Sequence, residues 1–579
     1  MIAARTSFGP IRIPAALRGR ALRTSTLAAG LFGSVLAGCA SNPTPTTAPV
    51  PATAPVPTPT TSPVAGTPSA AGLRPAPRTE AQPNWHRLDL EQDGVLGVGS
   101  ERALRELLAG RRPARKIVVA VIDGGVDTAH TMLSSVLWRN AKETAGNTRD
   151  DEGNGYIDDV IGWNYAGGKN GQSVHHDTFE MTRLYAACKG LPAGAGIAKP
   201  GSNDCVAVAT DYAKKRTEIS GTLQQITNLT SALEGTSKAL RDAMRVESLT
   251  VANVRAFKPS TQGTDQARSM WLQLADNGLS AKELAEAKKA YDSQFKFGLD
   301  TMFNPRGIVG DSAGVLPRGY GNRDVAGPDP MHGTHVSGII GARRDGGDVQ
   351  GIAPDVSIMA LRAVPDGDER DQDIANAIRY AADNGANIIN MSFGKGYSPQ
   401  KPAVDSAVRY AESKGVLMVH AAGNDGDNID VSPSFPSPNF VGGGRASTWI
   451  EVGASSWKGG GDIAAPFSNF GRQGVDLFAP GVDILSTLPG STTGKESGTS
   501  MAAPVVSGVA ALLMSYFPSM TAAEVKGVLV ESTRKLGDLD VTAPGDQGRI
   551  KFSALSRSGG VVDAFAAVKL ALQRENVRP

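Results

Sequence analysis

Four short segments, far apart in the chain, carry the residue types needed for covalent hydrolysis. They are centred on Asp123, His332, Asn424 and Ser500. A serine hydroxyl becomes a nucleophile when a base removes its proton, and a buried carboxylate can hold an imidazole in the tautomer that serves as this base. A side-chain amide can donate a hydrogen bond to the oxyanion that forms. Together the segments predict hydrolysis of an amide through an acyl-enzyme.

Ser500 and His332 are each followed by small, apolar residues that predict a buried helix. In the apolar run 501–517, Pro504 is tolerated because it falls in the first turn. Ser500 would then lie at a helix N-terminus, where free N–H groups favour negative charge. Taken alone, such a serine would more often be an N-cap, which is a common role. His335, three residues after His332, is interpreted as a packed structural histidine rather than as half of a metal site.

Asp123 and Asn424 each end an apolar segment that predicts a buried parallel strand. Asp123 ends KIVVAVID, and the carboxyl ends of parallel strands are where open α/β sheets place their sites. Asp127 is the alternative acid, but Asp123 directly follows the strand, and Gly124 and Gly125 let the chain turn away. Asn424 ends GVLMVHAAGN and could also be an ordinary asparagine in a strand-end turn.

The motifs HGTHVSG at 332–338 and GTSMAAP at 498–504 resemble those of the subtilisin-like serine proteases, or subtilases. The resemblance covers roughly 117–170 and 320–575. It implies an α/β, subtilisin-like three-layer fold, with a mainly parallel sheet flanked by helices. It also implies a serine endopeptidase that acts on polypeptide substrates and requires no cofactor for catalysis.

The resemblance assigns roles to particular residues. The triad would consist of Asp123, His332 and Ser500. Asn424 would hold the oxyanion together with the Ser500 N–H. An edge strand made of Ser392, Phe393 and Gly394, within NMSFG, would pair with the backbone of an extended peptide. Gly124 is a departure, because the family usually has Ser or Thr there, and the family's usual inhibitory prodomain is not recognisable in 81–116.

Two other functions are compatible with parts of this pattern. An inactive, subtilase-shaped binding protein of the envelope would be expected to have a broken triad or oxyanion site, and the sequence shows neither. An esterase would use the same residues, but the G-x-S-x-G turn of the usual esterase fold is replaced by GTSMA.

The N-terminal residues 1–38 are predicted to be a lipoprotein signal peptide. Five arginines precede a short apolar stretch that ends in Leu36-Ala37-Gly38-Cys39. Cys39 would be lipidated and would anchor the chain to a membrane without spanning it. An ordinary signal peptide with an incidental cysteine is the alternative. Because Ala40 follows the cysteine, the outer membrane of a bacterial cell envelope is the favoured location.

Residues 39–80 are rich in Pro, Thr and Ala, which predicts a flexible tether. The whole chain carries a formal charge of +2, so removal of the five arginines leaves about −3. This balance gives no basic patch that would indicate nucleic-acid binding. We expect a monomer whose partners are its substrates and, through the lipid, the membrane.

The catalytic domain is expected to span 117–579, preceded by an N-terminal extension at 81–116 that packs on it. It is interrupted by an insertion at 171–318 with helix-forming composition. The insertion would limit substrate access or bind a partner, or it would only decorate the scaffold. Under the first hypothesis, deleting 175–300 should widen the cleavage of large substrates.

Two further features concern the same region. Cys188 and Cys205 are expected to form a disulfide in an oxidising compartment, with two free thiols as the alternative. His175-His176-Asp177 is interpreted as a solvated loop rather than as a metal site.

An acidic loop at 150–167 resembles the start of a calcium-binding loop. Its candidate ligands are Asp150, Glu152, Asn154 and Asp158. Ile161 takes the place of the usual bidentate glutamate, so an acidic surface loop without calcium is equally compatible. Asp345, in RRDGGD, is a weaker second candidate.

Overall fold

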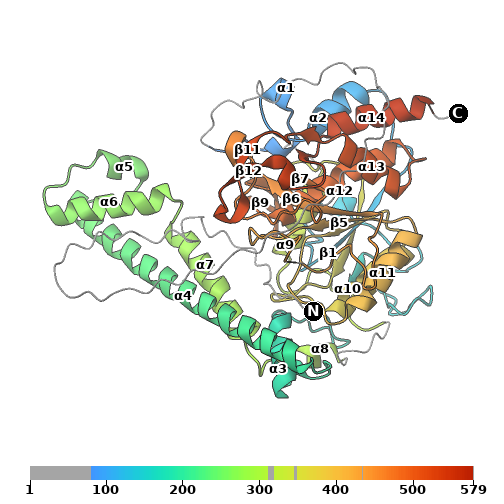
Figure 1. The fold of residues 1–579 in the computed structure, drawn as a ribbon, viewed down its shortest axis with the longest axis horizontal. Helices are drawn as coiled ribbons and strands as arrows, with labels where there is room; N and C mark the ends of the chain where they lie inside the picture. The colour runs from blue at the N-terminus through green and yellow to red at the C-terminus, as the bar shows by residue number, and fades with distance from the viewer. Residues whose placement is uncertain (1–79, 311–318, 344–348, 433, 578–579) are drawn as a thin grey trace, which may run out of the picture.

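The computed structural model describes residues 80–310, 319–343, 349–432 and 434–577, which form an α/β core and a long helical insertion (Figure 1). The predicted signal peptide, Cys39, the tether up to residue 79 and Asp345 lie outside the described residues.

The core is built on a nine-stranded sheet in the order β10-β13-β7-β6-β5-β4-β1-β3-β2. All neighbouring strands are parallel except β10 and β13 at one edge, which confirms the predicted mainly parallel sheet. The strands are β1 (Val118–Asp123), β2 (Gly162–Asn164), β3 (Ser357–Arg362), β4 (Ile388–Met391), β5 (Leu417–Ala421), β6 (Trp449–Ser455), β7 (Leu477–Pro480), β10 (Arg534–Lys535) and β13 (Gly560–Val561). Two antiparallel hairpins lie outside it: β8 (Ile484–Leu488) with β9 (Thr492–Glu496), and β11 (Asp540–Thr542) with β12 (Arg549–Lys551).

Helices cover both faces of the sheet, as the three-layer prediction requires. Side chains alternate along a strand, so Val119 and Val121 of β1 face one helical layer while Ala120 and Ile122 face the other. The first layer contains α9 (Met331–Gly341), α12 (Thr499–Tyr516), α13 (Ala522–Glu531) and α14 (Ala564–Val577). The second contains α10 (Asp371–Asp383) and α11 (Lys401–Ser413).

Helix α12 is the central helix of the first layer and packs on β4, β5, β6 and β7. Within the described ranges it is the one helix that is long and apolar enough to cross a membrane, yet 89% of that stretch is buried inside the protein. A helix that is apolar on all sides is expected at such a position in a core. Its composition is therefore explained by burial.

The N-terminal extension packs against the first layer and the loop before β8. It contains two short helices, α1 (Leu90–Asp93) and α2 (Ser100–Arg102), beside α14 (Figure 1). The Trp85 indole donates to the Val482 carbonyl at 3.0 Å, and the Ala564 N–H donates to the Val98 carbonyl at 2.7 Å. Helix α14 begins at Ala564, because Gly560 and Val561 form β13 at the sheet edge.

The insertion is helical and projects from one side of the core, with α5 and α6 at its far end (Figure 1). Its helices are α3 (Glu180–Lys189), α4 (Ser202–Met244), α5 (Val251–Ala256), α6 (Gln262–Asp276), α7 (Ala281–Ser293) and α8 (Arg306–Val309). Buried residues of α4 recur every seven positions, at Tyr212, Ile219, Ile226, Leu233 and Leu240. This spacing keeps one stripe of the helix against its neighbours α6 and α7.

Candidate active site

Asp123 and His332 meet at the carboxyl end of β1. Nδ1 of His332 lies 2.8 Å from Oδ1 of Asp123 and 3.0 Å from Oδ2. The carboxylate is 3% exposed and also accepts a hydrogen bond from the Gly124 N–H at 2.7 Å. A carboxylate held in this way fixes the imidazole so that Nδ1 carries the proton and Nε2 can act as a base.

Two glycines allow helix α9 to approach β1 this closely. A Cβ on Gly333 would lie 2.2 Å from the Gly125 carbonyl oxygen and 3.0 Å from the Asp123 Cβ. Gly125 has φ of +143° and turns the chain away from the strand end. The small residues around both motifs therefore have a steric purpose, which is to bring the acid and the base together.

The pKa of His332 is raised above its ordinary value of 6.5. Burial lowers this pKa, but the Asp123 carboxylate outweighs burial through its charge and its hydrogen bond, and Glu496 and Asp329 add to its effect. The imidazole remains 20% exposed, so it is accessible from the surface. Asp123 thus stabilises the protonated form that a general base must pass through.

Ser500 lies in the first turn of α12 and is 7% exposed. Its hydroxyl donates to the Ser392 carbonyl at 3.0 Å, and in the described part of the chain no hydrogen bond joins it to His332. In the absence of substrate, catalytic hydrogen bonds are often long or unformed. The Ser500 hydroxyl is therefore turned toward the strand end at Ser392. It would have to rotate before it could transfer its proton.

A chain of buried hydrogen bonds holds Ser500 against that strand end. Ser507 donates to Asn390 at 2.8 Å, Asn390 donates to Ser392 at 2.9 Å, and the Ser392 hydroxyl donates to the Ser500 carbonyl at 2.9 Å. Fully satisfied buried networks of this kind make a local structure rigid. The sequence analysis missed Asn390 and Ser507, although Asn390 lies within the NMSFG motif.

Asn424 is oriented by the residue that precedes the serine. Its Oδ1 accepts hydrogen bonds from the N–H of Thr499 at 2.8 Å and from the Thr499 hydroxyl at 3.0 Å. The Thr499 hydroxyl in turn accepts from the Gly423 N–H at 3.1 Å. With Oδ1 used as an acceptor, Nδ2 is the donating end of the amide, which is the end an oxyanion requires.

Ser392, Phe393 and Gly394 directly follow β4. Phe393 is 4% exposed and its ring packs in the core on the α10–α11 side of the sheet. This side chain therefore cannot line a substrate site, and only the backbone of the segment is suited to pairing with a peptide. Lys395, the next residue, pairs with the Phe435 backbone at 2.8 Å and 2.9 Å.

The residues that the sequence analysis set aside have structural roles. His335 is buried and its Nε2 lies 3.1 Å from the carbonyl oxygens of Ile484 and Gly494, so it connects α9 with the β8–β9 hairpin. Asp127 accepts hydrogen bonds from the N–H groups of Ala129 at 3.0 Å and Gly490 at 2.9 Å.

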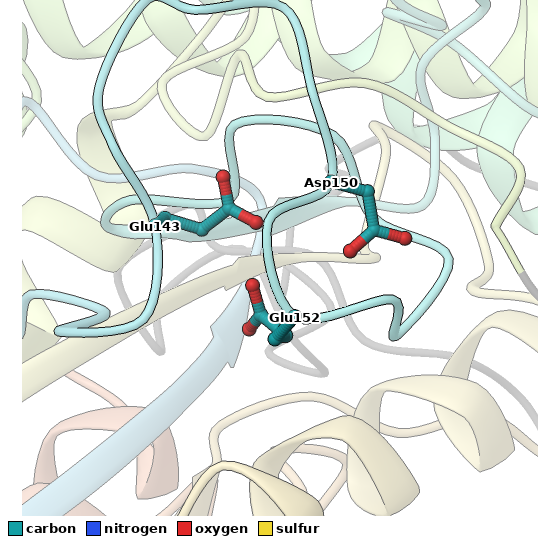
Figure 2. A group of neighbouring side chains, drawn as sticks. All are labelled: Glu143, Asp150 and Glu152. Atoms are coloured by element: carbon teal, nitrogen blue, oxygen red, sulfur yellow. The ribbon is translucent and has the colours of Figure 1, made fainter.

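Three carboxylates in the acidic loop converge in a way that differs from the predicted ligand set. Figure 2 shows Glu143, Asp150 and Glu152 pointing toward one another, and one ligand atom from each lies within 4.8 Å of the others. Asp158 is separate, because it accepts hydrogen bonds from the N–H groups of Gly146 and Thr148 and pairs with Arg323. Asn154 instead donates to Glu152 at 2.9 Å. Glu143, which precedes the motif, was not predicted.

This carboxylate group fits a hard divalent cation. One oxygen of Glu143 and one of Glu152 are buried without a hydrogen-bond partner. Burial, with the Glu152 carboxyl beside it, raises the pKa of Glu143 to about 7. Calcium takes several carboxylate oxygens as ligands and would satisfy these groups.

Cys188, at the end of α3, and Cys205, in α4, form a disulfide with an S–S distance of 2.01 Å. His176 stacks on Phe297, and its Nδ1 lies 2.8 Å from Asp366. The disulfide and this contact fasten the base of the insertion.

Comparisons with known proteins show that the chain is similar to serine proteases. The sequence model of the subtilase family, Peptidase S8, matches residues 317–548. Subtilisin DY of Bacillus licheniformis is 37% identical over 235 residues, which are 40% of this chain and 78% of that protein. A thermophilic serine proteinase of Bacillus sp. (strain AK1) is 42% identical over 193 residues, 32% of this chain and only 44% of that protein. Among solved structures, a protease from Pseudoalteromonas arctica PAMC 21717 is 30% identical with a TM-score of 0.35, covering 44% of this chain and 80% of that one.

Proposed function

Because this chain belongs to the subtilase family of serine proteases, we propose that it is an endopeptidase that cleaves polypeptides through an acyl-enzyme on Ser500. The observation that supports this most is the 2.8 Å contact between Asp123 and Nδ1 of His332 at the carboxyl end of β1. Ser500 comes from a third part of the chain, and its hydroxyl lies 3.0 Å from the Ser392 carbonyl, just beyond β4, the strand that pairs with β1.

The first step is attack on the substrate carbonyl. The Ser500 hydroxyl leaves the Ser392 carbonyl and gives its proton to Nε2 of His332 while Oγ bonds to the carbonyl carbon. Asp123 stabilises the resulting imidazolium. The Asn424 amide and the Ser500 N–H donate to the oxyanion, where the N-terminus of α12 also favours negative charge.

The second step releases the amine. His332 returns its proton to the leaving nitrogen as the C–N bond breaks, which leaves an ester on Ser500. Water, deprotonated by the same imidazole, then attacks this ester and regenerates the serine. The backbone at 392–394, directly after β4, would hold the substrate in an extended conformation as an added strand.

Labelling with a fluorophosphonate, which reacts only with an activated serine, tests the proposal. The purified protein should be labelled stoichiometrically, and Ser500→Ala should abolish both labelling and peptide turnover. Ser515→Ala, at the far end of the same helix, is the matched control and should be labelled normally. A well-folded protein that takes up no label would overturn the proposal and favour the inactive binding protein.

We further propose that the chain is a lipid-anchored monomer of the cell envelope that carries structural calcium. The short apolar stretch before Cys39 supports the anchor, and the fit of Glu143, Asp150 and Glu152 supports the ion. Metabolic labelling with a fatty-acid analogue tests the anchor. Fatty-acid labelling that persists in Cys39→Ser would refute the proposed lipid anchor.

A further inference from the structure

Eight ionisable side chains are buried together between the insertion and the segment that follows β4. They are the acids Asp177, Glu180, Asp368, Glu369 and Asp371, and the bases Arg183, Arg370 and Lys395. None is more than 6% exposed. Charges removed from water to this degree are tolerated only where partners and hydrogen bonds compensate them. The positions of these side chains are therefore mutually dependent.

Lys395 is the member of this cluster nearest the active site. Its ammonium group donates to Glu180 at 2.7 Å and to the Glu369 carbonyl at 2.7 Å, and it forms an ion pair with Asp371 at 2.9 Å. The ammonium, which can donate three protons, is thus surrounded by three oxygens. Because Lys395 follows Gly394 directly, these bonds fix the end of the backbone segment assigned to the substrate.

Glu180 belongs to the insertion, in the first turn of α3, and is held firmly itself. The carboxylate also pairs with Arg183 at 2.6 Å, and the Glu180 N–H donates to Asp368 at 2.8 Å. Arg183 donates in addition to the carbonyl groups of Asp368 and Glu369. The start of α3 and the 368–371 loop therefore form one unit with Lys395.

Tyr397 and Arg370 make further contacts between the insertion and the core. The Tyr397 hydroxyl donates to Asp211 of helix α4 at 2.6 Å. Its ring packs in an apolar cluster with Phe179, Tyr212 and Leu299 of the insertion. Arg370 binds Asp177 through two hydrogen bonds, of 2.8 Å and 3.0 Å. The insertion thus contacts the 395–397 segment through both α3 and α4.

We infer that Glu180 is a positioning residue, through which the insertion holds Lys395 and thereby sets the 392–394 backbone for extended peptides. This inference rests on the proposed endopeptidase function. It assigns the base of the insertion to substrate binding, whereas a stabilising role alone would leave substrate preference unchanged.

Glu180→Gln in the full chain tests the inference, because it removes the charge and keeps the shape. Loss of the charged partner should shift Lys395 and the backbone that it holds, so kcat/KM for a peptide that spans several residues should fall about tenfold, mainly through KM. The fluorophosphonate reacts with Ser500 without pairing with the extended segment. The labelling rate of the variant should therefore stay within about twofold of wild type. Equal losses in both assays, or no loss in either, would overturn the inference.

Two companion variants separate positioning from folding. Glu180→Gln combined with Lys395→Met removes one charge of each sign, so it should recover the melting temperature but not the peptide KM. Recovery of both would show that the pair only stabilises the fold. Asp211→Asn, which weakens the Tyr397 contact without touching the buried cluster, should raise KM by a smaller factor, and an unchanged KM would count against the inference.

Asp242→Asn is the matched control for Asp211, because Asp242 forms an exposed pair with Lys238 on the same helix far from the core. It should change neither assay. Failure of the proposed function would look different, since wild type itself would then take up no label and cleave no peptide.

Discussion

At the scale of single residues, the proposed base is already bonded to its acid, whereas the proposed nucleophile is bonded to a different part of the chain. His332 is already bonded to Asp123, whereas the Ser500 hydroxyl donates to the Ser392 carbonyl. The proton can move only after the hydroxyl rotates. The Ser392 carbonyl lies on the segment assigned to the substrate. A peptide bound there would therefore directly affect the hydrogen bond that the Ser500 hydroxyl donates.

The raised pKa of His332 predicts the pH profile. Burial lowers this pKa, but Asp123 raises it further, above 6.5 overall. Catalysis needs the neutral imidazole, so the acid limb of kcat/KM should have its midpoint above pH 6.5, measured between about pH 5 and 9. Asp123→Asn should move the limb to lower pH and reduce kcat by about 10⁴. A wild-type limb at or below pH 6.5 would contradict the assignment.

The same shift affects stability with a defined sign. A raised folded-state pKa makes a contribution to stability that is complete below the unfolded value of 6.5. This contribution is lost as the pH rises through the folded-state value. The fold therefore favours the charged imidazole, while turnover needs the neutral one.

Asn424→Ala should lower kcat by about 10²–10³, a range established on a subtilisin and carried over to this chain. KM for peptides should change little, because the amide acts on the oxyanion rather than on the bound substrate. Fluorophosphonate labelling should be slower but still complete. A variant with full kcat would remove Asn424 from the oxyanion site.

At the scale of elements, the sequence predicted those features that depend on local patterns, such as the ends of strands and the start of a helix. Asp123 ends an apolar strand, Asn424 follows one by three residues, and Ser500 lies in the first turn of an apolar helix, so periodicity and motif together indicated them. Glu143 could not be predicted, because it reaches Asp150 only when the loop closes on itself. The pairing of Glu180 with Lys395 joins positions 215 apart, and no local pattern records it.

The disulfide between Cys188 and Cys205 joins α3 to α4, next to the buried charges. By loop entropy, its separation of 17 residues corresponds to about 3 kcal/mol of stabilisation. Replacing both cysteines with serine should lower the melting temperature and make the 190–201 loop an early site of limited proteolysis. Unchanged cleavage rates in this loop would show that the base of the insertion is ordered without the bond.

Calcium should stabilise the protein through the acidic loop. At about 100 times its dissociation constant, a bound ion would contribute about 2.7 kcal/mol. The melting temperature should therefore rise with calcium in wild type and fall with a chelator, but not in Glu143→Gln/Glu152→Gln. Glu247→Gln, an exposed acid of the insertion, should respond as wild type does. A double variant that still responds would place the ion elsewhere.

At the scale of the whole molecule, the insertion has two parts. Its base shares an apolar cluster with Tyr397 of the core and carries the buried charges. Farther out, two apolar clusters are made of insertion residues alone, around Ile226 and around Leu240. The base belongs to the catalytic body, while the distal part has its own small core.

This division changes the deletion that tests whether the insertion restricts access. Removing 175–300 would take Glu180 from the buried Lys395 and Asp177 from the buried Arg370, and the loss of such partners is strongly destabilising. Replacing 230–283 with a short Gly/Ser turn should instead leave the melting temperature and short-peptide kinetics nearly unchanged. Faster cleavage of folded proteins by this variant would show that the distal helices limit access, and unchanged cleavage would refute it.

Strand β1 lies inside the sheet, between β4 and β3, although it is the first strand in the chain. Its pairing brings Val118 beside Ser357, about 240 positions away, and the closure of such a loop is slow and entropically costly. The helices of the insertion form from contacts close in sequence and shorten that loop. We therefore expect the sheet to close only when most of the chain has been synthesised. Ser500 leaves the ribosome later still, so under the proposed function the nascent polypeptide would gain its nucleophile only after the acid and the base have been synthesised.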